Sequence, residues 1–317
     1  MNKSNNLRGT CLVTGGAGFI GSNLVDYLIN KGIQVTVIDN LSSGKLLNLR
    51  ESINKITFIK DDLESYDLKT LDKIDYVIHL AAQASVPFSI SNFKESSNIN
   101  LKSSINIIDY CSKNKIPLVY ASSSAIYGEL PNGDDSFSKI DLISPYAADK
   151  YFLEVYSQIS NKLYNLSSIG LRFFNVYGPR QDSKNPYSGV ISIFADRILQ
   201  AKEITINGGF QTRDFVYVSD VIGIIYEALF LVSNKPICKI SNVLTGMSVT
   251  IDHLAEEIIS IVGSKVSKNY SDMLIGDPVK SDGNTENMSD LFKINIKSLT
   301  TLHAGLTKTI ESIKNQG

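Results

Sequence analysis

Cysteine is scarce in this chain of 317 residues, and its three cysteines lie far apart. They are Cys11, Cys111 and Cys238. Without a CxxC pair, the sequence predicts neither a metal site nor a disulfide framework, and it fits a reducing cytoplasm. The histidines are equally scattered, at His79, His253 and His303. We therefore expect no metal centre, and we expect each histidine to be structural.

Excess charge and long apolar runs are also missing. The 31 Lys and Arg residues nearly balance the 32 Asp and Glu residues, which leaves a formal net charge of −1. This balance gives no electrostatic reason to expect nucleic acid or an anionic membrane as a partner. The longest apolar stretch, residues 221–232, contains Glu227 and is too short to span a bilayer. Residues 1–10 lack the apolar core of a signal peptide, so we expect a cytoplasmic protein.

The first half of the chain alternates short apolar runs with amphipathic segments. The runs span residues 11–14, 35–39, 56–60, 76–81, 118–122 and 169–174. Between the first two runs, Leu24, Val25 and Leu28 share one helical face, and Gly32 follows the end of this helix. Alternating strands and helices predict an α/β fold with a doubly wound parallel sheet of the Rossmann type. Ligands of such sheets bind at the carboxyl ends of the strands.

The pattern changes in the second half of the chain. Residues 175–210 are rich in Gly, Pro and Asn, with one helical stretch near residues 191–202. A strand and a helix return at residues 215–232, a further strand follows at 237–242, and the rest is helical and irregular. The predicted division is residues 1–174 plus 211–243 for a nucleotide-binding domain and residues 175–210 plus 244–317 for a smaller substrate-binding lobe.

A glycine-rich turn follows the first predicted strand. Gly15, Gly18 and Gly21 have the GxxGxxG spacing and lead directly into a helix. The first glycine permits a tight turn, the second lets backbone N–H groups approach a pyrophosphate, and the third allows close packing of helix on strand. The turn therefore predicts a dinucleotide site.

Asp39 ends the second predicted strand, 18 residues after Gly21. A carboxylate at this point accepts hydrogen bonds from the adenosine ribose and repels a 2′-phosphate, which selects NAD over NADP. Lys45 is the only nearby cation and lies too far along the chain to favour NADP. The alternative is that Asp39 only starts the turn formed by residues 39–44.

Tyr146 and Lys150 form a Tyr-x-x-x-Lys pair on a predicted helix. A tyrosinate can take the proton of an alcohol if its pKa is lowered, and a lysine four residues later supplies positive charge on the same helical face. Residues 122–124 are serines at the end of the preceding strand, where a hydroxyl can hold the reacting oxygen. A second pair, Tyr27 and Lys31, lies after the glycine turn and is interpreted as accidental.

Together these residues resemble the extended short-chain dehydrogenase/reductase family, and within it the UDP-hexose 4-epimerases. The resemblance covers residues 15–21, Asp39, Asp62, 79–82, 122–128, Tyr146, Lys150, 172–180 and 213–215. It implies NAD as cofactor and assigns catalysis to Ser123, Tyr146 and Lys150. The cofactor contacts that it implies are Gly15, Gly18, Phe19, Ile20, Gly21, Asp39, Asn40, Ser42, Ser43, Gly44, Asp62, Leu63, Leu80, Ala81, Ala82, Asn98, Ser122, Tyr146, Lys150 and Phe174. The substrate contacts that it implies are Ser85, Ser123, Ser124, Tyr146, Asn175, Val190, Arg213, Asp277 and Ser281.

Three positions narrow the implied reaction. The related dehydratases carry Thr-Asp-Glu where residues 123–125 read Ser-Ser-Ala, so the acid and base of a dehydration are missing. Pro87 stands where UDP-glucuronate epimerases carry an arginine, which favours a neutral hexose. Ser281 is small enough for an N-acetylated sugar. The resemblance thus implies UDP-GlcNAc/UDP-GalNAc and/or UDP-Glc/UDP-Gal as substrates, although Leu274 replaces an arginine that often contacts phosphate.

Other interpretations remain open at this point. One is a sugar-nucleotide reductase or dehydrogenase, or a UDP-glucuronate 4-epimerase; another is a non-catalytic NAD-binding protein. Arg213, expected to grip the UDP pyrophosphate, has the alternative of a surface ion pair with Asp214. The resemblance further implies a homodimer formed through residues 97–113 and 146–161, and a place in polysaccharide biosynthesis.

Overall fold

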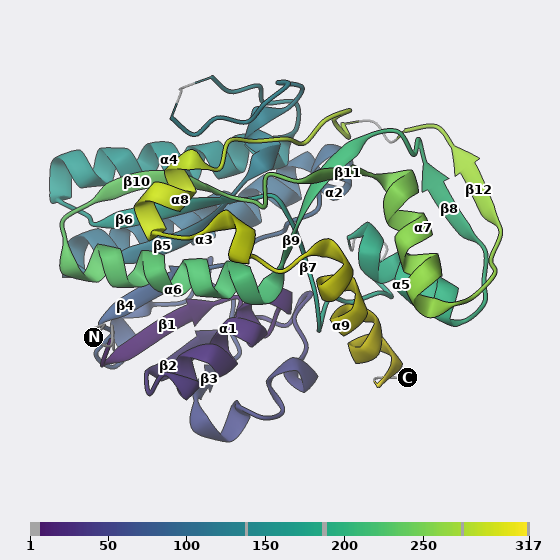
Figure 1. The fold of residues 1–317 in the computed structure, drawn as a ribbon. Helices are drawn as coiled ribbons and strands as arrows, with labels where there is room; N and C mark the ends of the chain where they lie inside the picture. Colours follow the sequence, from purple (N-terminus) through teal and green to yellow (C-terminus); the bar gives the residue numbers. More distant parts are fainter. Residues whose placement is uncertain (1–6, 137–138, 186–188, 274–275, 316–317) are drawn as a thin grey trace.

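The computed structural model describes residues 7–136, 139–185, 189–273 and 276–315. A seven-stranded sheet lies at its centre, with the strand order β10-β6-β5-β4-β1-β2-β3 and every pairing parallel (Figure 1). Its strands are β1 (Thr10–Thr14), β2 (Gln34–Ile38), β3 (Thr57–Ile59), β4 (Tyr76–His79), β5 (Leu118–Ser123), β6 (Ser168–Phe173) and β10 (Cys238–Val243). The predicted Rossmann-type parallel sheet is confirmed.

Helices cover both faces of this sheet. On one face lie α1 (Phe19–Asn30) and α6 (Val218–Asn234), and on the other lie α3 (Phe93–Asn114) and α4 (Pro145–Tyr164). Successive strand residues point to opposite faces. Thus Val13 of β1 joins the apolar cluster that contains α1 and α6, whereas Leu12 joins the cluster that contains residues of α3 and α4.

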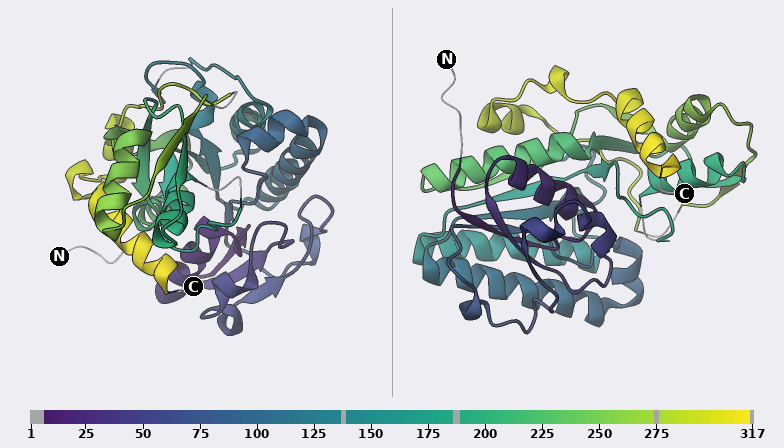
Figure 2. Two further views of the ribbon diagram at one scale, coloured as in Figure 1. Left: turned by 90° about the vertical axis from the view of Figure 1, so that its right-hand side faces the viewer. Right: turned by 90° about the horizontal axis from the view of Figure 1, so that it is seen from below.

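A smaller lobe lies to one side of the sheet (Figure 2). It contains the three-stranded sheet β11-β9-β7 and the two-stranded sheet β12-β8. Its strands are β7 (Asn175–Tyr177), β8 (Ile204–Asn207), β9 (Thr212–Tyr217), β11 (Ser248–Thr250) and β12 (Lys268–Ser271).

The remaining α-helices of the described residues, from both parts of the molecule, are α2 (Val86–Ser91), α5 (Val190–Leu199), α7 (Ile251–Val262), α8 (Glu286–Phe292) and α9 (Leu302–Lys314). The short 3₁₀ helices are η1 (Leu46–Leu49), η2 (Ile53–Lys55), η3 (Leu68–Thr70), η4 (Ser124–Tyr127) and η5 (Ile296–Ser298).

The sequence prediction was wrong about the regular structure of this lobe. Strands β7, β8, β11 and β12 stand where only helical or irregular structure was expected. Each has three or four residues, which is too short for an alternating pattern to be recognised. Their pairing partners lie far along the chain: β12 pairs with β8, and β11 pairs with β9. Long-range pairing, rather than local pattern, therefore makes these strands.

The predicted division into two lobes remains a proposal. Strand β9, which we assigned with the nucleotide-binding domain, pairs with β7 and β11. Conversely, α8 of the last segment packs on β10 and α6. The two lobes therefore share elements along their boundary, and this boundary is where the carboxyl ends of the central strands meet the smaller lobe.

Candidate active site

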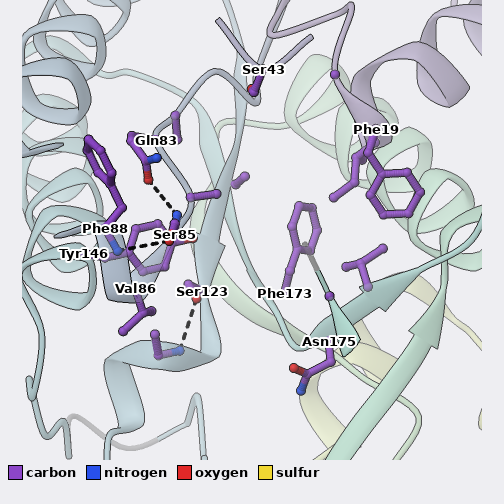
Figure 3. Close-up of a pocket in the computed structure, with 18 of the residues that line it drawn as sticks. Phe19, Ser43, Gln83, Ser85, Val86, Phe88, Ser123, Tyr146, Phe173 and Asn175 are labelled. Atoms are coloured by element: carbon purple, nitrogen blue, oxygen red, sulfur yellow. Dashed lines mark hydrogen bonds between the residues drawn. The ribbon is translucent and has the colours of Figure 1, made fainter. Parts of the chain in front are cut away.

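A cavity of about 1080 Å³ lies between the carboxyl ends of the central strands and the smaller lobe. In Figure 3, Tyr146, Ser85 and Ser123 line one wall, and Phe19 and Asn175 lie across from them. Nearly all the residues that the sequence assigned to cofactor and substrate line this cavity. The size of the cavity suits a dinucleotide together with a second ligand.

Two predicted cofactor contacts do not line the cavity. Asn98 is exposed on α3, whereas its neighbours Glu95 and Ile99 do line the cavity. Gly44 lies behind the wall, where a Cβ would meet Ala17 and the Asp39 carboxylate. Helix phase and loop packing turn these two residues away from the space that their neighbours face, and their contact with the cofactor stays a prediction.

The glycine turn has the backbone geometry that a pyrophosphate requires. Gly15 has φ of +70°, which favours glycine, and a Cβ on Gly21 would overlap the Gly15 carbonyl oxygen. Helix α1 starts after Gly18, which has no side chain to cap the first turn. The N–H groups of that first turn therefore suit an anionic ligand, as does the positive end of the helix dipole.

Asp39 lies at the end of β2 with only 8% of its surface exposed. Its Oδ2 accepts a hydrogen bond from the Ala17 N–H at 2.9 Å, and its Oδ1 accepts one from the Leu41 N–H at 2.8 Å. The carboxylate thus holds the glycine turn and the following loop while it also lines the cavity. Lys45, the cation nearest in sequence, forms an ion pair with Asp182 at 2.5 Å. These residues fit an adenosine ribose without a 2′-phosphate.

The predicted catalytic residues lie together in the cavity. Ser144 caps α4 by accepting a hydrogen bond from the Ala147 N–H, and this places Tyr146 in the first turn of the helix. The Lys150 Nζ donates to the carbonyl oxygen of Ala121 at 2.9 Å. The Ser123 hydroxyl lies close enough to Tyr146 to influence its pKa, and it accepts a hydrogen bond from the Ala125 N–H at 3.1 Å.

The pKa of Tyr146 differs from the sequence expectation. Burial raises the pKa of Tyr146 to about 12, although the neighbouring Ser123 hydroxyl lowers it. Burial also lowers the pKa of Lys150 to about 8. Desolvation is thus the largest influence on the pKa of Tyr146, and the net shift is opposite to the lowering that the sequence led us to expect. A further positive charge in the cavity would favour the phenolate.

The substrate end of the cavity contains an ion pair that the sequence did not predict. Arg213 of β9 pairs with Asp277, and both residues had been assigned to the substrate. The alternative pairing of Arg213 with Asp214 is wrong. The Asp214 carboxylate instead accepts hydrogen bonds from Thr245, Gly246 and Met247 and so anchors the loop before β11.

The other predicted substrate residues also face the cavity. Asn175, Val190, Ser85, Ser124 and Ser281 line it, as do Asp62, Leu63, Leu80, Ala81, Ala82, Asn40, Ser42, Ser43, Ile20 and Phe174 on the cofactor side. Ser281 is held in place because its N–H donates to the carbonyl oxygen of Thr212 at 3.2 Å. Leu274 lies outside the described residues.

Residues that the sequence gave no role in the site have structural partners. The Lys31 Nζ lies 5.2 Å from the ring centroid of Tyr27 on α1, and neither residue lines the cavity. His79 is buried, and its Nδ1 lies 2.8 Å from the Thr14 hydroxyl. Burial lowers the pKa of His79 to about 3, so it is neutral and structural.

Sequence reasoning missed several buried polar residues beside the catalytic ones. Asn100 accepts from the Gln83 N–H and donates to the Asp149 carboxylate, one residue before Lys150. Glu154, one turn beyond Lys150, lies buried next to the end of β5. The sequence held one signal for these residues: each is a polar residue on the apolar face of a helix. A polar side chain in that position normally requires a buried hydrogen-bond partner.

Metal ligands and membrane spans are both absent from the part of the chain that the structure describes. Within the described ranges, no group of three His, Cys, Asp or Glu residues is arranged to hold a metal ion. No helix among the described residues is both long and apolar enough to cross a membrane.

Comparisons with known proteins agree with this geometry. Residues 11–243 match the NAD dependent epimerase/dehydratase family. The UDP-glucose 4-epimerase of Mycolicibacterium smegmatis is 32% identical over 96% of this chain and 98% of its own length. The structure of Thermotoga maritima UDP-glucose 4-epimerase with UDP-glucose is 34% identical, with a TM-score of 0.90 over 97% of this chain and 99% of that one. The UDP-N-acetylglucosamine 4-epimerase of Methanobrevibacter ruminantium is 36% identical, with a TM-score of 0.87 over the same shares of the two chains.

Proposed function

This chain belongs to the NAD-dependent epimerase/dehydratase family, and we propose that it inverts carbon 4 of a neutral UDP-hexose through a 4-keto intermediate. UDP-GlcNAc/UDP-GalNAc and UDP-Glc/UDP-Gal are the proposed substrate pairs. The observation that carries the proposal is the meeting of Tyr146, Lys150 and Ser123 in the cavity that contains the glycine turn.

Each of the proposed site residues has a separate role in the reaction. Bound NAD supplies a hydride acceptor and donor, together with a positive charge that favours the Tyr146 phenolate. Tyr146 takes the proton of the 4-hydroxyl group, and Ser123 holds the oxygen by a hydrogen bond. Arg213 binds the diphosphate and so keeps the 4-keto intermediate in the cavity while its sugar ring rotates to present the opposite face. Tyr146 then returns the proton to the C4 oxygen. Because oxidation and reduction cancel, we expect no net consumption of NAD.

One feature supports epimerisation over dehydration, and two others favour a neutral or N-acetylated hexose. Ser124 and Ala125 line the cavity where a dehydratase needs an acid and a base. Pro87 also lines it and supplies no charge for a C6 carboxylate. Ser281 leaves space beside the sugar, which favours acceptance of an acetamido group.

A product assay tests the proposal. The protein is incubated separately with UDP-Glc, UDP-GlcNAc and UDP-GlcA, and NMR identifies the products. We expect C4 epimers of one or both neutral sugars and no change in added NAD(H). Stoichiometric formation of NADH with an oxidised sugar would instead identify a dehydrogenase, and binding of NAD without any turnover would favour a non-catalytic role.

We also propose that two copies pair through α3 and α4. Both helices expose apolar side chains on their outer surface, among them Ile105, Tyr156, Ile159 and Leu163. The rings of Phe152 and Tyr156 on α4 contact each other in a tilted arrangement, with centroids 4.1 Å apart. Pairing this surface would bury an apolar patch that water otherwise covers. We further propose a cytoplasmic location, which the three free cysteines support, and a role in supplying sugar precursors for polysaccharide synthesis.

A further inference from the structure

The buried face of α4 meets the end of β5 through a series of polar contacts. Tyr146, Lys150 and Glu154 are spaced four residues apart, so they share one face of the helix. Lys150 donates to the carbonyl oxygen of Ala121, and the Ser122 hydroxyl donates to Glu154 Oε1 at 2.5 Å. The next strand residue is Ser123, whose hydroxyl lies close enough to Tyr146 to lower its pKa. Two consecutive residues of β5 are thus hydrogen-bonded to α4, and the third lies beside the phenol.

Glu154 also connects a second strand, β6, to the buried face of α4. Arg172 of β6 donates from Nε to Oε1 at 2.8 Å and from Nη2 to Oε2 at 2.7 Å. Ser122 and Arg172 are register partners across β5 and β6. One carboxylate therefore fixes two neighbouring strand ends to the catalytic helix, and the paired side chains are nearly inaccessible to solvent.

The network continues away from α4. The Arg172 guanidinium carbon lies 4.9 Å from the ring centroid of Tyr127, and the Tyr127 hydroxyl donates to Asn242 of β10 at 2.6 Å. Glu154 itself does not line the cavity, whereas Ser122 does. Any effect of Glu154 on a ligand must therefore be indirect, through its hydrogen bond to Ser122 of β5.

Stability alone gives a weak reason for this arrangement. Burial of two charges costs desolvation energy that a buried ion pair only partly recovers, and an apolar pair of similar volume is often equally stable. The position of the ion pair at the end of β5 gives a stronger reason for its presence. The separation between Ser123 and Tyr146 depends on how the end of β5 sits against α4, and Glu154 fixes that relationship through Ser122.

We infer that Glu154, together with Arg172, is a positioning residue that holds the Ser123 hydroxyl against the Tyr146 phenol. The inference rests on the proposed function for its kinetic consequence, though not for its geometry. Neither Glu154 nor Arg172 contacts the reacting atoms; both act by locking the ends of β5 and β6 onto α4. A displacement of about 1 Å between catalytic groups can reduce a rate roughly hundredfold.

The test removes the ion pair without leaving a buried charge. In the double variant Glu154→Met/Arg172→Met, we expect a thermal midpoint close to that of the wild type. With the UDP-hexose that the wild type converts, kcat should fall roughly ten- to hundredfold, while KM stays within about twofold. Ser157→Ala is the matched control, because it removes a buried hydrogen bond from the same helix to Ser168. Its kcat should be unchanged. A double variant with wild-type kcat would overturn the inference.

A second variant and a spectroscopic measurement make the test independent of folding and turnover. Ser122→Ala removes the hydroxyl that binds Glu154 and leaves the ion pair intact. Tyrosinate absorbance of each holoprotein, minus that of its Tyr146→Phe counterpart, reports the pKa of Tyr146. This pKa should rise in Ser122→Ala and in the double variant, because the Ser123 hydroxyl is held less closely to the phenol, and should stay constant in Ser157→Ala. If the wild type converts no UDP-sugar, the proposed function fails, and the pKa still decides the inference: an unchanged value in both variants overturns it.

Discussion

The Nζ atom of Lys150 lies 5.8 Å from the centroid of the Tyr146 ring, and the carbonyl oxygen of Ala121 fixes it there. The ammonium group is therefore positioned by the end of β5 rather than by the phenol. The pKa of Lys150, lowered to about 8 by burial, is close to physiological pH.

Removal of the phenol hydroxyl should abolish proton transfer while the fold persists. For Tyr146→Phe we expect kcat for the UDP-hexose to fall roughly 10²- to 10⁴-fold, as is typical for loss of a general base. Retained NAD, measured by absorbance after denaturation, should equal that of the wild type. Tyr27→Phe, in the second Tyr-x-x-x-Lys pair outside the cavity, serves as control and should keep full activity. Wild-type turnover by Tyr146→Phe would exclude the proposed mechanism.

Lys150 should make stability depend on pH in alkaline solution. Burial lowers its pKa in the folded protein to about 8 from the ordinary lysine value of 10.5, so the unfolded chain binds more protons between these limits. The free energy of unfolding of the nucleotide-free protein should therefore rise as the pH increases from about 8 to 10.5. Lys150→Met should remove this slope and raise stability at neutral pH by about 3 kcal/mol. Urea unfolding at several pH values measures both effects, and a wild type with no slope in this window would contradict the prediction.

Asp39 should determine cofactor selectivity. Asp39→Ala removes a charge-assisted acceptor from the ribose, so NAD affinity should fall roughly ten- to hundredfold. Asp39→Asn keeps the size of the side chain and removes the charge that repels a 2′-phosphate, so the ratio of NADP to NAD affinity should rise. Fluorescence titration with each dinucleotide gives the dissociation constants. Because Asp39 also holds the backbone of Ala17 and Leu41, thermal midpoints are measured in parallel, and equal NAD affinity in all three proteins would refute the role.

Loss of Arg213 should weaken UDP binding, whereas loss of the Asp277 charge should not. Arg213→Met removes the cation proposed for the diphosphate, so calorimetry with UDP should show roughly ten- to hundredfold weaker binding. Asp277→Asn removes the carboxylate that now pairs with Arg213, so UDP should bind as tightly or more tightly. Retained NAD should stay constant in both. Weaker UDP binding by Asp277→Asn would mean that this carboxylate is needed to hold Arg213 in place.

The proposed dimer makes a prediction about a single exposed residue. Ile159→Glu places a charge on the outer surface of α4 and should convert a dimer into a monomer in light scattering coupled to size exclusion. Leu47→Glu is the control: Leu47 is 67% exposed on η1, away from α3 and α4, and its substitution should leave the mass unchanged. A wild type that is already monomeric would refute the proposal.

Local sequence determined the central sheet and most of the candidate site. The β-type runs became β1 to β6 and β10. The central strands were recognisable because strands buried on both faces, such as β5 and β6, are rich in apolar residues. The glycine turn, Asp39 and the Tyr146–Lys150 pair were recognisable because each role depends on a short spacing within one strand–turn–helix unit.

Tertiary structure alone decided what depends on distant partners. The short strands of the smaller lobe form only by long-range pairing. Arg213 forms its ion pair with Asp277 rather than with Asp214, its neighbour in sequence. The pKa of Tyr146 rises because the fold removes water from it. Likewise, Glu154 joins Arg172 and Ser122 only where β5, β6 and α4 converge. Burial and long-range contact are properties of the packed chain, so no local spacing could have revealed them.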